Sequence, residues 1–148
     1  MSQQQRDALD QLLCDAPLDL GGDVAEQRVI FDEMMAAIPV PADVTTSSAS
    51  LGGIPVVNVE VAGADHASVT FYLHGGAYAI GTAASSVGLA SDLARRAGTR
   101  LVTVDYRLAP EHPHPSALDD AVAATADCST AASPRQRSRS RASPRVPA

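Results

Sequence analysis

The chain has 148 residues, of which 45% are hydrophobic and only 3% aromatic, so it is long enough for one domain with a core of Leu, Val, Ile and Ala. Its start shows no basic segment followed by an apolar one, and no apolar run reaches the ~20 residues of a membrane helix, so we expect a cytoplasmic protein without a signal peptide or a membrane partner. Cys14 and Cys128 lie far apart in sequence and provide neither a zinc site nor a disulfide framework.

Two helices are predicted near the beginning of the chain, over residues 4–13 and 24–37. In the second helix, apolar residues recur every three to four positions at Val29, Ile30, Met34 and Ala37. Pro39 and Pro41 end this helix, since proline cannot continue the hydrogen-bond ladder.

Two strands are predicted next. Residues 42–53 are polar and are predicted to form a loop, whereas residues 54–63 alternate between apolar and polar side chains as a half-exposed strand does. The second strand follows within the distance of a hairpin, and its apolar face carries Val69, Phe71 and Leu73. It leads directly into two adjacent glycines.

A helix and a further strand complete a βαβ unit. Ser85 or Ser86 is placed to cap the helix, and Gly98 is placed to end it. The predicted apolar stripe consists of Leu89, Leu93 and Ala97. A strand over residues 100–108 follows, and a strand–helix–strand order implies parallel pairing with a right-handed crossover, so the fold class is α/β.

The character of the chain changes near Asp127. A helix is predicted from Ser116, its N-cap, over residues 116–125, but no helical or strand pattern follows it. All 17 acidic residues lie at or before Asp127, whereas five of the 11 basic residues, all of them Arg, crowd into residues 135–145. On composition alone, residues 127–148 are predicted to be disordered.

The sequence "YLHGGAYAIG", residues 72–81, has the features of an anion-binding turn. Glycines between a strand and a helix permit positive φ and a close approach of the backbone to a ligand. An oxyanion hole needs two backbone N–H groups aimed at one oxygen, and Gly75 and Gly76 are suited to supply them. A turn kept for packing alone remains an alternative, and the pattern is neither of the two common nucleotide-binding motifs.

Other polar residues cluster after the later strand. His112 and His114 lie beside Glu111, but no third nitrogen or thiol ligand is evident, so no metal site is expected. Asp105 and Arg107 end a parallel strand, where sites often form, but an ion pair or hydrogen bonds that brace the following proline-rich loop are favoured.

Two stretches, "FYLHGGAYAIG" and "LVTVDYRLAPEHPHPSALDDAVAA", together resemble the hormone-sensitive-lipase-like carboxylesterases and lipases of the α/β-hydrolase family. They occur in that family's order and separation, and the resemblance covers most of residues 1–126. It divides the chain into a helical cap segment (1–45), a partial α/β-hydrolase core (46–126) and an aberrant tail (127–148). Ala77 replaces the usual third glycine of the His-Gly-Gly-Gly motif.

The resemblance implies a mostly parallel sheet under a helical cap, and hydrolysis of a small-molecule ester by a Ser-His-Asp triad through an acyl-enzyme. It assigns the oxyanion hole to Gly75 and Gly76, a supporting role in the loop to His74, and no cofactor or metal. The triad itself is missing, because the sequence contains no G-x-S-x-G motif. The chain as printed is therefore expected to be inactive, and its oligomeric state is left open.

A one-base change of reading frame would supply the missing motif. Back-translation of residues 127–148 with GC-rich codons, read from each codon's last base, allows the sequence LLDRGIAPPALALAGESAGAG. It contains an apolar strand followed by G-E-S-A-G, the expected nucleophile turn. We hypothesise a frameshift between Ala123 and Asp127, which would leave an incomplete chain that folds poorly, with exposed strand edges at residues 69–73 and 101–104.

Two other interpretations remain open at this point. The chain could be a non-enzymatic module whose Arg/Ser tail binds nucleic acid, in which case binding would depend on salt and require residues 134–148. It could also be a hydrolase-like remnant that serves as a structural or ligand-binding partner, in which case it should be soluble and unfold cooperatively.

Overall fold

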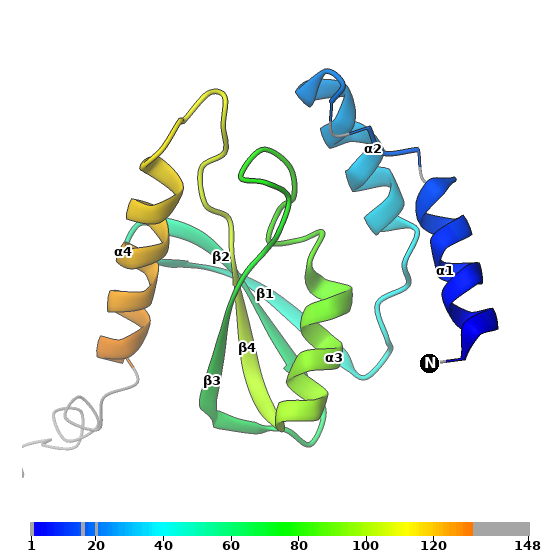
Figure 1. The fold of residues 1–148 in the computed structure, drawn as a ribbon. Coiled ribbons are helices and arrows are strands. Elements are labelled where there is room, and N and C mark those ends of the chain that lie inside the picture. Colours follow the sequence, from blue (N-terminus) through cyan, green and yellow to red (C-terminus); the bar gives the residue numbers. More distant parts are fainter. Residues whose placement is uncertain (1, 16, 20, 132–148) are drawn as a thin grey trace, which may run out of the picture.

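The computed structural model describes residues 2–15, 17–19 and 21–131. Four strands form one mixed sheet, and helices cover both of its faces (Figure 1). The elements are, in chain order, α1 (Gln3–Cys14), α2 (Val24–Ala36), β1 (Val44–Leu51), β2 (Ile54–Val61), β3 (Asp65–Leu73), α3 (Val87–Ala97), β4 (Thr99–Val104) and α4 (Ser116–Ala131). Within these described residues, no helix is long and apolar enough to cross a lipid bilayer.

The strand order is β1-β2-β4-β3, with β3 and β4 parallel and the other two pairs antiparallel. The predicted βαβ unit is thus confirmed, and the fold class is α/β. The strands β2 and β3, which are close in sequence, are not neighbours, because β4 lies between them. The predicted edge at residues 101–104 is therefore wrong, whereas β3 lies at the end of the described sheet.

The polar loop predicted over residues 42–53 is also wrong, since most of it forms β1. This strand pairs with β2 over its full length, and Gly52 and Gly53 form the two-residue turn with φ of 58° and 83°. Two adjacent positive φ angles are what a tight hairpin needs. The side chains of β1 are mostly exposed, so its serines and threonines remain accessible to water.

The core has two parts, one on each face of the sheet. The α3 side contains Val59, Val61, Val87, Ala90, Ala94 and Leu101. The α4 side contains Val56, Val102, Val104, Tyr106 and Ala124. Successive residues of β4 point to opposite faces, and this alternation places Leu101 against α3 and Val102 against α4.

The buried faces of α2 and α3 differ from the predicted faces. In α3 the buried residues are Val87, Ala90, Ser91 and Ala94, whereas Leu89 of the predicted stripe is exposed. Ser86 is its N-cap residue without a side-chain cap bond, and Gly98 ends it in the left-handed conformation, as predicted. In α2, Val29 is exposed and the buried residue is Gln27.

With Ser116 as N-cap, the predicted first helical residue is Ala117, so helix α4 begins one residue earlier than predicted. It runs from Ser116 to Ala131. It thus extends past Asp127, where the sequence analysis placed the start of the tail. The rest of that tail, 132–148, lies outside the described residues, so the three-part division of the chain stays a prediction.

Candidate active site

The glycine turn leaves β3 at Leu73 and crosses the carboxyl end of the sheet. The N–H groups of Ala79 and Ile80 donate to the Gly76 carbonyl at 2.9 and 3.0 Å, which closes a tight turn. Gly76, Ala77 and Tyr78 have φ of 117°, 54° and 60°. Ala77, which replaces a glycine of the family motif, therefore adopts a left-handed conformation that costs a non-glycine residue about 1–2 kcal/mol.

Two glycines in this turn have no room for a side chain. A Cβ at Gly76 would overlap the carbonyl oxygen of Ile80, and a Cβ at Gly81 would lie 2.7 Å from Nδ1 of His74 and 3.0 Å from the Gly75 carbonyl oxygen. Both residues also have positive φ. The turn thus requires glycine at these positions for steric as well as conformational reasons.

The N–H groups of Gly75, Gly76 and Ala77 donate no hydrogen bond within the part of the chain that the structure describes. Gly75 is exposed and Gly76 is partly exposed. Backbone N–H groups that are unpaired and accessible are available to an incoming oxygen atom.

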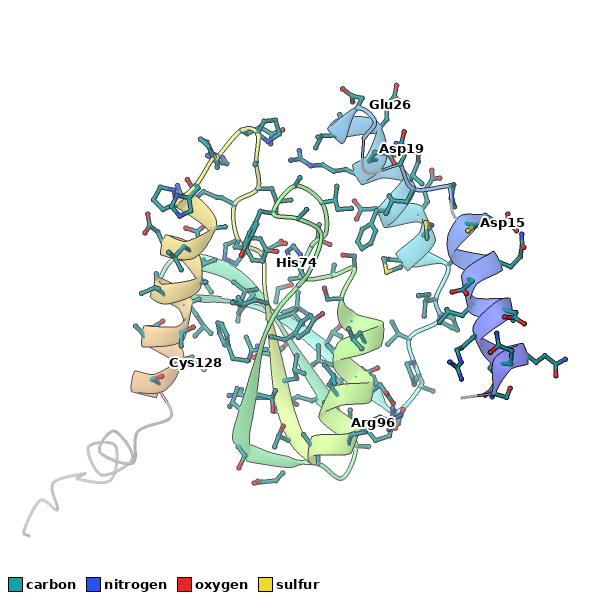
Figure 2. The ribbon with its side chains drawn as sticks, viewed as in Figure 1. Asp15, Asp19, Glu26, His74, Arg96 and Cys128 are labelled. Carbon is teal, nitrogen blue, oxygen red and sulfur yellow. The ribbon has the colours of Figure 1, made fainter. Side chains whose placement is uncertain are left out.

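His74 lies beneath the loops that follow β3 and β4 and is almost fully buried (Figure 2). Its Nδ1 donates to the Gly75 carbonyl oxygen at 2.8 Å, and its ring stacks on Tyr106 with centroids 4.2 Å apart. With the proton on Nδ1, the buried Nε2 is an acceptor, and it has no partner among the described residues.

Tyr106 supports the backbone of His74. Its hydroxyl group donates to the His74 carbonyl oxygen. Burial, together with the nearby Tyr78 and Tyr72, raises the pKa of Tyr106 to about 12, so the phenol stays protonated and keeps its donor at neutral pH. The aromatic pair thereby fixes the residue from which the turn starts.

Asp105 and Arg107 are predicted to brace the following proline-rich loop, and each binds a different segment. Asp105 accepts a hydrogen bond from the N–H of Ala83 at 2.9 Å, beyond the glycine turn. Arg107 forms an ion pair with Asp120 of α4 at 2.7 Å, and its own N–H donates to the same carboxylate at 2.9 Å. Hydrogen bonding to Arg107 lowers the pKa of Asp120.

Arg28 of α2 was not anticipated from the sequence. Its guanidinium group binds the carbonyl oxygens of Ala79 and Ala109 and both carboxylate oxygens of Glu111, each at 2.8 Å. Hydrogen bonding to Arg28 lowers the pKa of Glu111 to about 2. The sequence around Arg28 carries no signal for these partners, because they lie 51 to 83 residues away.

Several cavities surround the turn. One of about 250 Å³ is lined by Gly75, Gly76 and His74 together with the apolar side chains of Phe31 and Met35 from α2. A larger one of about 440 Å³ lies between the turn and α4, and His112 and His114 are among its lining residues. Within the described residues, no group of three or more His, Cys, Asp or Glu is placed to hold a metal ion.

The first of these cavities contains two serine side chains, but both are engaged elsewhere. Ser85 accepts from the N–H of Thr82 at 2.8 Å and donates to the Thr82 carbonyl oxygen at 3.0 Å, and Ser86 donates to the same carbonyl at 3.0 Å. These bonds stabilise the entry into α3. An activated nucleophile instead needs a hydrogen bond to a general base, and neither serine makes one in the described structure.

A family model described as the alpha/beta hydrolase fold matches residues 70–143, which is half of the chain. The chain belongs to the α/β-hydrolase fold family. The matched range includes the glycine turn, β4 and α4, and it continues beyond the described residues.

Relatives and solved structures agree with this assignment. An acetyl-hydrolase of Streptomyces hygroscopicus is 37% identical over 70% of this chain and 34% of its own length. The carboxylic ester hydrolase LipN of Mycobacterium tuberculosis is 32% identical over 72% of this chain and 30% of its own length. The crystal structure of an esterase from the bacterial hormone-sensitive lipase family is 29% identical, with a TM-score of 0.78 over 88% of this chain and 44% of that one.

A hormone-sensitive lipase from a metagenome library is similarly close, with 32% identity and a TM-score of 0.77 over 86% of this chain and 43% of that one. The chain is thus a hormone-sensitive-lipase-like member of the family. It spans about a third of the length of the curated relatives and a little over two fifths of these solved structures.

Proposed function

We propose that this chain carries the oxyanion-binding part of a carboxylic ester hydrolase. The observation that supports the proposal most strongly is the pair of N–H groups at Gly75 and Gly76, which have no partner among the described residues and lie beside a cavity that Phe31 and Met35 of α2 help to line. A strained turn is retained there, and strain of this kind persists only where the surrounding structure enforces it.

In the intact enzyme, a serine attacks the ester carbonyl carbon, and the carbonyl oxygen becomes the oxyanion of a tetrahedral intermediate. Gly75 and Gly76 donate to that oxygen, and loss of one such donor costs about 3–4 kcal/mol in the transition state. His74 keeps the carbonyl of Gly75 turned away from this oxygen through its Nδ1 hydrogen bond. A histidine takes the serine proton as the serine attacks and returns it to the leaving alcohol, and the same histidine then activates the water that hydrolyses the acyl-enzyme.

The serine, the histidine and the aspartate of this scheme are not assigned to residues of the printed chain. We propose that the serine is encoded in the shifted frame of residues 127–148, within G-E-S-A-G, and that the chain as printed is inactive. A small-molecule ester is the proposed substrate, and the cytoplasm is the proposed location. No nucleic-acid or membrane partner is part of the proposal.

Two proteins test this function: the printed chain, and the product of the same gene corrected by one base. Each is incubated with p-nitrophenyl acetate and, separately, with a fluorophosphonate probe that labels activated serines. We expect hydrolysis and labelling for the corrected protein, and neither for the printed chain. Substitution of the G-E-S-A-G serine by alanine should abolish both, because it removes the nucleophile.

A corrected protein that is folded but neither hydrolyses the ester nor reacts with the probe would contradict the proposal. Labelling of the printed chain would also contradict it, since Ser85 and Ser86, the two serines beside the proposed oxyanion hole, bond to Thr82 and not to a general base. The alanine variant of the corrected protein controls for non-enzymatic ester hydrolysis by surface residues.

A further inference from the structure

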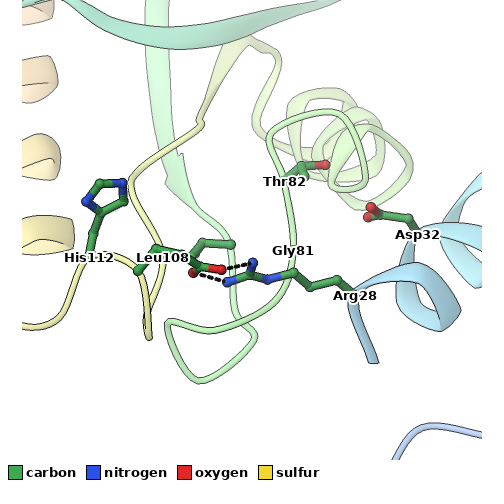
Figure 3. Close-up of a pocket in the computed structure, with 7 residues that line it drawn as sticks. Arg28, Asp32, Gly81, Thr82, Leu108 and His112 are labelled. Carbon is green, nitrogen blue, oxygen red and sulfur yellow. Dashed lines mark hydrogen bonds and ion pairs between the residues drawn. The ribbon is translucent and has the colours of Figure 1, made fainter. Parts of the chain in front are cut away.

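Arg28 connects three segments that are far apart in the sequence. From α2 it donates through Nε to the Ala79 carbonyl oxygen in the glycine turn, and through Nη2 to the Ala109 carbonyl oxygen in the loop after β4. Its two terminal nitrogens also bind the carboxylate of Glu111 in a bidentate pair (Figure 3). The Arg28 side chain is 27% exposed and that of Glu111 is 55% exposed, so the pair lies at the surface while the carbonyl contacts are partly buried.

The contact with Ala79 connects Arg28 to the turn that carries the proposed oxyanion hole. Arg28 binds the carbonyl oxygen of Ala79, and the N–H of Ala79 donates to the Gly76 carbonyl oxygen within the turn. The adjoining Tyr78 carbonyl oxygen accepts a hydrogen bond from the N–H of Ala109 at 2.8 Å, and the Ala109 carbonyl in turn is held by Arg28. One guanidinium group therefore holds the C-terminal side of the turn directly, through Ala79, and indirectly, through Ala109 and its bond to Tyr78.

This loop needs external support because Ala77 and Tyr78 both occupy the left-handed region. Each such residue would relax if the surroundings allowed it. A planar fork of donors can hold two carbonyl oxygens and a carboxylate at once, whereas a lysine ammonium offers a single point charge without that geometry.

We propose that Arg28 is a positioning residue that couples α2 to the oxyanion turn, so that the N–H groups of Gly75 and Gly76 are correctly oriented only while this helix is docked. The inference rests on the proposed function. Arg28 is not among the residues that line the cavity beside the two glycines; it lines a separate one of about 290 Å³ with Asp32, Gly81 and His112. It therefore acts through the Ala79 carbonyl rather than on the substrate.

The first test needs no enzymatic activity and uses both the printed chain and the frame-corrected protein, so that it does not depend on how well the incomplete chain folds. Amide hydrogen exchange and the ¹H–¹⁵N resonances of the turn are compared for Arg28→Ala, Arg28→Lys and the control Arg96→Ala. The control removes an exposed arginine that pairs with Asp92 within α3 at 2.8 Å. We expect the Ala79 and Ile80 amides to exchange faster by on the order of tenfold in both Arg28 variants, with shifted Gly75 and Gly76 resonances, and no change in the control.

The second test uses the frame-corrected protein. Arg28→Lys should lower kcat by up to about 100-fold with a smaller change in KM, because misplaced oxyanion donors weaken transition-state binding more than substrate binding. If Arg28→Ala unfolds the chain, amide exchange is measured in Glu111→Gln instead. This substitution weakens the bidentate pair with Arg28 and keeps the shape of the side chain.

The inference is wrong if the turn amides respond to Arg28→Lys and Glu111→Gln no more than to Arg96→Ala. It is equally wrong if the corrected enzyme is active and Arg28→Lys leaves its kcat unchanged. Failure of the proposed function gives a different pattern: the turn amides of the printed chain still respond to the Arg28 variants, but the corrected protein hydrolyses no ester.

Discussion

Substitution of Gly76 by alanine tests whether the turn has the steric requirement that the site depends on. The new Cβ would overlap the Ile80 carbonyl oxygen and lie 2.8 Å from the Ile80 carbonyl carbon, in a backbone with φ of 117°. Gly63→Ala is the matched control, since its φ is also positive at 83° but nothing lies within 4 Å of the added Cβ.

The two variants separate backbone strain from steric overlap. Gly63→Ala should lower the free energy of unfolding by about 1–2 kcal/mol through backbone strain alone. Gly76→Ala bears a similar strain and also forces the Ile80 backbone to move, which costs about 1–3 kcal/mol more by analogy with overpacked sites. Because the N–H of Ile80 closes the turn on the Gly76 carbonyl, this movement opens the turn itself.

Urea unfolding of the frame-corrected protein, followed by far-UV circular dichroism, measures both losses. The slopes of the transitions show whether the unfolded states of the two variants are comparable. The steric reasoning is refuted if Gly76→Ala loses no more stability than Gly63→Ala. The ¹H–¹⁵N spectrum of each variant then shows whether the change is confined to the turn.

Three further outcomes follow from the packing and charges. Tyr106→Phe removes the donor to the buried His74 carbonyl and should destabilise the chain by about 1–3 kcal/mol in urea unfolding; an unchanged midpoint would mean that water replaces the hydroxyl group. Leu101→Ala empties a fully buried position that faces α3 and should cost about 2–5 kcal/mol in urea unfolding, and a cost below about 1 kcal/mol would contradict the assigned core. Because Arg28 lowers the pKa of Glu111 from 4.5 to about 2, the stability difference between the wild type and Glu111→Gln should be complete above pH 4.5 and disappear as the pH falls to about 2; a difference lost above pH 5 would contradict the pairing.

Local patterns in the sequence predict much of the framework around the site. The βαβ unit, the glycine turn after β3 and the Gly98 helix end all rest on short-range signals, namely periodicity and residues suited to positive φ. The order of the strands cannot be predicted from such short-range signals, because the pairing of β2 with β4 depends on contacts between segments that are distant in the chain.

The strand β1 and the site residue Arg28 are missed by the sequence-based prediction for two different reasons. The strand β1 has a polar and mostly exposed sequence, so its pairing with β2 leaves no apolar alternation to detect. The role of Arg28 in the site could not be predicted from the sequence, since its partners Ala79, Ala109 and Glu111 lie 51 to 83 residues away. Two of those partners are backbone carbonyls, which carry no sequence signal at all.

We propose that this chain holds the oxyanion turn of an esterase whose nucleophile is encoded in another frame. The decisive experiment is to sequence the coding DNA from the Ser116 codon through and beyond the Ala148 codon and to translate all three frames. We expect one shifted base to restore a strand followed by G-E-S-A-G, with an aspartate and a histidine of the triad further downstream in that frame. DNA that encodes the printed tail, with no hydrolase-like sequence in any frame after it, would contradict the claim.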